Sequence, residues 1–118
     1  MLRYLIDEHL LHFVTRLRRL APELVVIGIG DPGAPARGTA DPGVLIWCGQ
    51  HAMVLVSADY RTMGHHFDAH LAAGRSSPGV VLVNAGLSDA EAVDLLILVA
   101  TVLEPSELRD RLRFLGSL

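Results

Sequence analysis

The sequence predicts an α/β fold, a three-layer domain with a central, mainly parallel sheet of about four strands and helices on both faces. Short apolar runs alternate along the chain with longer segments of helical spacing. The apolar runs contain almost no polar residues, which is typical of strands covered on both faces of a parallel sheet. The length of 118 residues is that of one ordinary domain, so we expect a single domain over residues 1–118.

The first part of the chain contains two expected strands, one helix and a long loop. Leu2–Ile6 and Leu24–Ile27 are short apolar runs, and we expect both to be strands. Between them, residues 8–20 are expected to form a helix whose apolar residues recur on one face. The segment from Gly28 to Gly43 is rich in Gly and Pro and has no periodicity, which predicts a loop. Loops of this length in small domains are often functional.

The middle of the chain repeats the alternation of helix and strand. A helix is expected to begin near Asp41, with Pro42 suited to its first turn, and to end near Gln50. Met53–Ser57 and Val80–Val83 are apolar, strand-like runs. Between them, Tyr60–Ala73 has a weaker helical pattern.

The last part of the chain is expected to be helical. Ser88, followed three residues later by Glu91, is a capping box, and the helix it starts is expected to run to about Leu103. Because this helix is apolar on nearly all sides, it is either buried in the domain or used for self-association or partner binding. A final helix is expected from Pro105, with apolar residues on one face at Leu108, Leu112 and Leu115.

The composition predicts a soluble cytoplasmic protein. The single cysteine, Cys48, cannot form an intramolecular disulfide, and its apolar surroundings favour a buried position. The first 20 residues contain several charges and do not resemble a signal peptide. The longest apolar run, Leu95–Ala100, is too short to span a membrane. The formal net charge of −3 argues against nucleic-acid binding by charge attraction alone.

Three aspartates are expected at the carboxyl edge of the sheet. Asp7 follows the first strand, Asp59 lies two residues beyond Ser57, and Asp41 begins the helix that leads into the third strand. Ligands of open parallel sheets bind at this edge. Because carboxylates that share a site repel one another, such a cluster normally holds a cation, and oxygen ligands suit Mg²⁺ or Mn²⁺. Asp59→Asn is then expected to stabilise the metal-free fold.

Each of these carboxylates also has a purely structural interpretation. Asp41 could be the N-cap of its helix. Asp7 and Glu8 could interact with the N-terminus of the first helix, and Asp59 could be a turn residue. The sequence leaves both interpretations open.

Several motifs, taken in order, resemble the PIN-like family of nucleases. LRYLIDEHL resembles the opening of PIN-like toxin domains, a strand that ends in Asp-Glu. TADPGVLIWCGQHAMVLVSADY resembles the second block of the family, in which an Asp opens a helix and an apolar strand ends in Thr/Ser-Ala-Asp. SSPGVVLV resembles its Pro-Gly turn and last strand. Each motif is short, but together they cover most of the chain in the family's order.

The resemblance implies an activity, a cofactor and a partner. It implies an endoribonuclease, the VapC-like toxin of a toxin–antitoxin pair, that hydrolyses RNA with a Mg²⁺- or Mn²⁺-activated water and binds a small antitoxin protein. Asp7, Asp41 and Asp59 match the acidic positions of the family as catalytic residues and metal ligands, with Glu8 as a fourth catalytic candidate. Ser57 matches a small hydroxyl residue near the site.

The sequence departs from the family pattern at two places. Arg61 stands where the family often has a second acid after the third strand. His9, Leu10 and Leu11 replace the Asn-Leu-Pro that often follows Asp-Glu. These departures support an alternative in which the chain is a catalytically degenerate interaction module.

Two further groups of residues offer other functions. In the cluster His65–His70, the residues His66 and His70 are four apart and could bind zinc from one helix face, with Asp68 nearby. The alternative is a solvated helix surface. The run of Arg109, Arg111 and Arg113 is expected to be an exposed helix face that could guide RNA or bind an acidic partner. A homodimer is a further expectation from the apolar helix that ends near Leu103.

Overall fold

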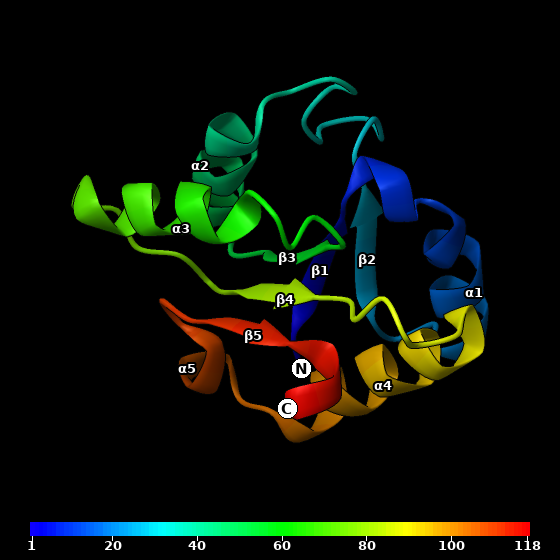
Figure 1. The fold of residues 1–118 in the computed structure, drawn as a ribbon. Helices are drawn as coiled ribbons and strands as arrows, with labels where there is room; N and C mark the ends of the chain where they lie inside the picture. Colours follow the sequence, from blue (N-terminus) through cyan, green and yellow to red (C-terminus); the bar gives the residue numbers. More distant parts are fainter.

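The computed structural model describes residues 1–118 as a sheet between two layers of helices (Figure 1). In chain order the elements are β1 (Arg3–Ile6), η1 (Glu8–Leu10), α1 (His12–Leu20), β2 (Val25–Gly28), α2 (Asp41–His51), β3 (Val54–Ser57), α3 (Met63–Ala72), β4 (Val80–Leu82), α4 (Asp89–Val102), α5 (Pro105–Leu108), β5 (Leu112–Phe114) and η2 (Leu115–Ser117). The predicted α/β class is therefore confirmed, with five parallel strands in place of about four.

The sheet has the strand order β2-β1-β3-β4-β5, and every pair of neighbours is parallel. The strands are short and almost entirely apolar, and all four residues of β3 are buried. Parallel strands need crossover connections, which here are the helices. Since all strands point the same way, their carboxyl ends form one edge of the sheet and their amino ends form the other.

Two apolar cores lie on the two faces of the sheet. Alternate residues of the strands, such as Tyr4, Val56 and Val81, pack with α1 and α4 in one core. The residues between them, such as Leu5 and Leu55, pack with α2 and α3 in the other. Figure 1 shows the same division, with α2 and α3 on one side of the sheet and α1 and α4 on the other. This layering explains why the strands lack a polar face.

The prediction of a final helix from Pro105 is correct only for its first turn. Only Pro105–Leu108 is helical, and the chain then continues as the edge strand β5. The turn between them places Asp110 at φ +59°, and its carboxylate accepts hydrogen bonds from the Ser77 backbone N–H at 2.7 Å and the Ser76 hydroxyl at 2.9 Å. These contacts, 33 and 34 residues apart in sequence, bring β5 beside β4. The arginines 109, 111 and 113 therefore do not form a helix face.

Helix boundaries elsewhere differ from expectation by a few residues. The first helix is divided, because Glu8–Leu10 forms a 3₁₀ turn before α1 begins. The capping box of Ser88 and Glu91 is present, and five of the ten apolar residues of α4 are buried. Leu98 and Val102 remain 55% and 65% exposed. Burial inside the domain thus accounts for half of the apolar residues of α4.

None of the helices has the length and apolar character needed to cross a membrane.

Gly79 is required where the chain enters β4. Its φ of +120° is one that residues with a side chain rarely adopt, and an added Cβ would lie 2.5 Å from the carbonyl oxygen of Leu108. We expect Gly79→Ala to destabilise the fold by at least about 2 kcal/mol, which lowers the melting temperature by roughly 8 °C. Gly86→Ala is the control, since Gly86 has no positive φ and open space around it. Equal thermal melts for the two variants would contradict this role of Gly79.

Candidate functional site

Asp7 lies directly after β1 and is linked to the end of β3 by the hydroxyl of Ser57. The two carboxylate oxygens of Asp7 accept hydrogen bonds from the Glu8 backbone N–H at 2.8 Å and the Ser57 hydroxyl at 3.0 Å. The Ser57 hydroxyl also accepts a hydrogen bond from the backbone N–H of Asp59 at 3.1 Å. Ser57, at the centre of this polar bridge, is fully buried. It brings Asp7 and Asp59 to the same edge of the sheet.

Asp41 is the first residue of α2, and its carboxylate does not cap the helix. The N-cap position belongs to Ala40, and no side chain makes a capping hydrogen bond there. Partial burial raises the pKa of Asp41 above its ordinary value, and the negative charges of Asp7 and Asp59 raise it further. The purely structural interpretation of Asp41 as an N-cap is therefore wrong. The surroundings of Asp41 destabilise the charged form of its carboxyl group.

The surroundings of Asp59 stabilise its charged form, in contrast to those of Asp41. The hydroxyl of Thr62 donates to its carboxylate, and the backbone N–H groups of Thr62 and Arg61 donate at 3.2 Å each. These hydrogen bonds hold the pKa of Asp59 below its ordinary value, and the bond from the Thr62 hydroxyl has the largest effect. Asp59 therefore does have the turn role that its sequence position allows. Because these hydrogen bonds stabilise the charge of Asp59, Asp59→Asn is not expected to stabilise the metal-free fold, contrary to the expectation from the sequence.

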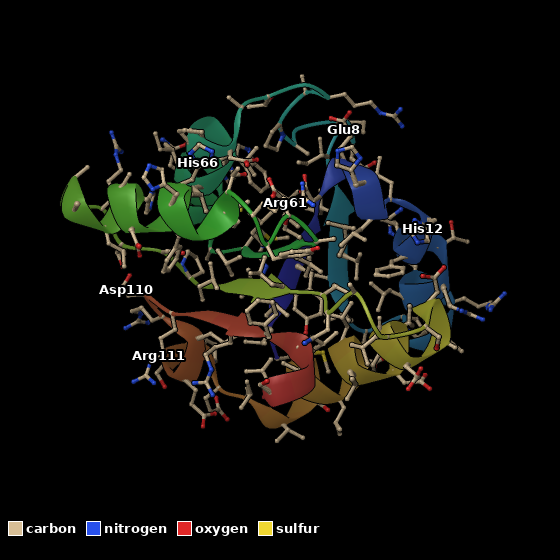
Figure 2. The ribbon with its side chains drawn as sticks, viewed as in Figure 1. Glu8, His12, Arg61, His66, Asp110 and Arg111 are labelled. Carbon is tan, nitrogen blue, oxygen red and sulfur yellow. The ribbon has the colours of Figure 1, made fainter.

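Glu8 connects this edge to the long loop before α2. Its Oε1 accepts a hydrogen bond from the backbone N–H of Gly38 at 2.8 Å. Figure 2 shows Glu8 at the same end of the molecule as Arg61 and His66. This contact makes Glu8 an anchor for the loop that leads into Asp41, besides any role in chemistry.

The histidines of α3 have separate surroundings. The Nε2 of His66 lies 3.9 Å from Oδ2 of Asp41, and its positive form would lower the pKa of both Asp41 and Asp59. His70 is buried, and its Nε2 lies 3.0 Å from the carbonyl oxygen of Ser76. The spacing of four residues suggested a shared zinc site, but His66 belongs to the acidic group and His70 does not. Nothing in the sequence signals the proximity of His66 to Asp41.

We refer to Asp7, Asp41 and Asp59 as the acidic edge. The charges of Asp7 and Asp59 both act on Asp41, and Arg61 is exposed beside Asp59, to which its backbone N–H donates. No group of three or more His, Cys, Asp or Glu side chains is assembled so that it could hold a metal ion by itself. Mg²⁺ rarely needs such a cage, because it keeps several waters and takes one or two carboxylates together with substrate phosphates. The oxygen donors of the acidic edge fit that mode of binding.

Cys48 is excluded as a nucleophile. It is buried in α2, as expected, and burial raises the pKa of its thiol to about 12, with a smaller contribution from the charge of Asp7. A thiol needs a lowered pKa to react readily.

No known protein family, curated protein or solved structure matches this chain. The similarity to the PIN-like family thus rests on the short motifs of the sequence.

Replacing Asp41 should stabilise the metal-free protein. In Asp41→Asn the shape is kept while one charge is removed from a repelling group, so we expect a rise of up to about 4 °C in melting temperature at pH 7 in EDTA, corresponding to at most about 1 kcal/mol. Because the pKa of Asp41 is raised in the folded state, its charge costs stability at neutral pH. This cost falls as the pH drops through the raised pKa. The variant and the parent should melt alike below the ordinary value of 3.8.

Asp59→Asn is the matched comparison. Since the lowered pKa of Asp59 means that its charge stabilises the fold above its ordinary value of 3.8, the substitution should give no stabilisation at pH 7. The contribution of Asp59 is lost only as the pH falls through its lowered pKa. Thermal melts of both variants between pH 3 and pH 7 make the comparison. If the melting temperature rose as much in Asp59→Asn as in Asp41→Asn, the two carboxylates would be equivalent. That result would contradict the conclusion that the surroundings destabilise the charge of Asp41 and stabilise that of Asp59.

Proposed function

We propose that this protein is a metal-dependent endoribonuclease that acts as the toxin component of a toxin–antitoxin pair. The observation that carries the proposal is the carboxylate of Asp41. It has no capping role, it is partly buried, and it faces the charges of two other aspartates. Such an arrangement costs stability in the free protein and becomes favourable when a cation is bound.

The donor set supports Mg²⁺ or Mn²⁺ as that cation. Asp41 would be a direct ligand, since its oxygens make no capping hydrogen bond to its own helix. Asp7 would be the second ligand, oriented by the hydrogen bond from Ser57. Asp59 would contribute through its charge or an intervening water, because its oxygens already accept three hydrogen bonds. Two carboxylates and waters are the usual protein share of a magnesium site.

The residues around the acidic edge are suited to phosphodiester hydrolysis. A bound cation supplies an activated water and stabilises negative charge on the phosphate. Arg61 lies at the same end of the molecule as His66 and offers positive charge to a phosphate backbone (Figure 2). With a formal net charge of −3, the protein depends on such local cations for contact with RNA. The antitoxin partner is proposed from the family resemblance alone.

A catalytically inactive interaction module is the second candidate. It is favoured by Arg61, which replaces a second acid, and by the absence of a preassembled group of three metal ligands. Binding of metal without cleavage of RNA would distinguish this candidate from the nuclease.

The first test of the proposal is metal-dependent stability. We expect Mg²⁺ at ten times its Kd to stabilise the parent by about 1.4 kcal/mol, or roughly 5 °C. Asp41→Asn and Asp7→Asn should remove this shift. Asp94→Asn is the control, because Asp94 is exposed on α4 and takes part in none of the interactions of the acidic edge. In a parallel assay on a fluorescently labelled single-stranded RNA, the first two variants should lose at least about 100-fold in cleavage rate.

The outcomes separate the two candidates. Stabilisation by Mg²⁺ with no cleavage of RNA by the parent would favour the interaction module. Neither stabilisation nor cleavage, or equal cleavage by the parent and Asp41→Asn, would overturn the proposed nuclease.

A further inference from the structure

A hollow of about 320 Å³ lies at the amino edge of the sheet, opposite the acidic edge. Its lining comes from segments that enter four strands, with Arg3 and Val54 at the starts of β1 and β3, Pro78 before β4 and Arg109 before β5. We call it the amino-edge pocket. Figure 2 shows Asp110, the neighbour of Arg109, well apart from Glu8 and His66 at the acidic edge. The pocket is therefore separate from the proposed nuclease site.

The inner wall of the amino-edge pocket is apolar and firmly packed. Leu2 and Val54 line it and are 2% and 4% exposed, so they belong to the core of the domain. Pro78 adds a rigid apolar surface. The volume is at the lower end of the range for pockets that hold small organic ligands.

Arg3 and Arg109 both line this pocket, and the charge of Arg109 contributes to holding the pKa of the neighbouring Asp110 below its ordinary value. Neither Arg3 nor Arg109 takes part in any of the three ion pairs of the structure. Arg3 makes a single hydrogen bond, from Nη1 to the carbonyl oxygen of His51 at 3.0 Å, which leaves most of its five donors free. The nearby carboxylate of Asp110 is already bound by the Ser76 hydroxyl and the Ser77 backbone N–H.

Two arginines beside an apolar wall indicate the chemistry of a ligand that would fit the pocket. Guanidinium donors match carboxylate, sulfonate and phosphate oxygens, and the wall matches a flat apolar group. Small-molecule sites commonly combine an apolar lining with a few convergent polar groups. We propose that the amino-edge pocket binds a small organic anion, with an apolar body against Leu2, Val54 and Pro78 and an anionic head bound by Arg3 and Arg109. This site does not depend on the proposed nuclease function.

The test uses 8-anilinonaphthalene-1-sulfonate, a dye with an apolar body and one anionic head. The parent should bind it saturably with one-to-one stoichiometry and increased fluorescence. Arg109→Gln and Arg3→Gln should each weaken binding about tenfold, through loss of a charged hydrogen bond. Arg19→Gln is the matched control, since Arg19 is exposed on α1 and makes no ion pair. The uncharged relative N-phenyl-1-naphthylamine should bind the parent and both pocket variants alike.

Backbone amide NMR spectra locate the bound dye. Shifts should appear at Val54, Ser77 and Gly79, at the starts of β3 and β4. Sulfate alone should not displace the dye, because it has no apolar body. The proposal is overturned by an absence of saturable binding, or by equal binding to Arg109→Gln, Arg3→Gln and Arg19→Gln. It is also overturned by displacement with sulfate alone, or by shifts confined to the exposed apolar residues of α4.

Discussion

The pairing of β1 with β3 sets the geometry on which the acidic edge depends. Ile6 is paired with Val56, and the backbone N–H of Asp7 donates to the carbonyl oxygen of Val56 at 2.9 Å. This register places Asp7 beside Ser57, whose hydroxyl joins it to Asp59. A shift of one residue would turn the side chains of β3 to the opposite face, removing this bridge and exchanging residues between two apolar cores. The burial that specifies the fold thus also positions the carboxylates.

The three aspartates of the acidic edge differ because their local backbones differ. Asp7 and Asp59 precede short turns, and backbone N–H groups of those turns donate to their carboxylates, while Asp59 also accepts a hydrogen bond from the Thr62 hydroxyl. Asp41 already lies inside the first turn of a helix, beyond the N-cap position, so its carboxylate receives no capping hydrogen bond. Asp41 is therefore the member of the acidic edge whose charged form is destabilised, and its pKa is raised. His66, which is positive only when protonated, lies beside Asp41. The distance of 3.9 Å from its Nε2 to Oδ2 of Asp41 is too long for a direct hydrogen bond.

The two edges of the sheet carry different side chains near the central strands. At the carboxyl edge β1 and β3 lead into Asp7 and Asp59, whereas at the amino edge Arg3 begins β1 and Arg109 precedes β5. The parallel arrangement makes this separation possible, since all strands contribute like ends to one edge. A ligand at the amino edge would contact the starts of the same strands that carry the carboxylates at their other ends.

The sequence alone determined the parallel α/β class, the first four strands and the common edge of Asp7, Asp41 and Asp59, because these follow from apolar runs and from the direction of the chain. It also located the capping box of α4, a local interaction. Tertiary structure decided that Leu112–Phe114 is a strand. The spacing of Leu108, Leu112 and Leu115 fits a helix, but pairing with β4 and the contacts of Asp110 with Ser76 and Ser77 determine the conformation there. It also decided that His66 lies beside Asp41 and not with His70, and that Asp41 is left without a hydrogen bond from its own helix. These features depend on packing between segments far apart in the chain, which local periodicity does not encode.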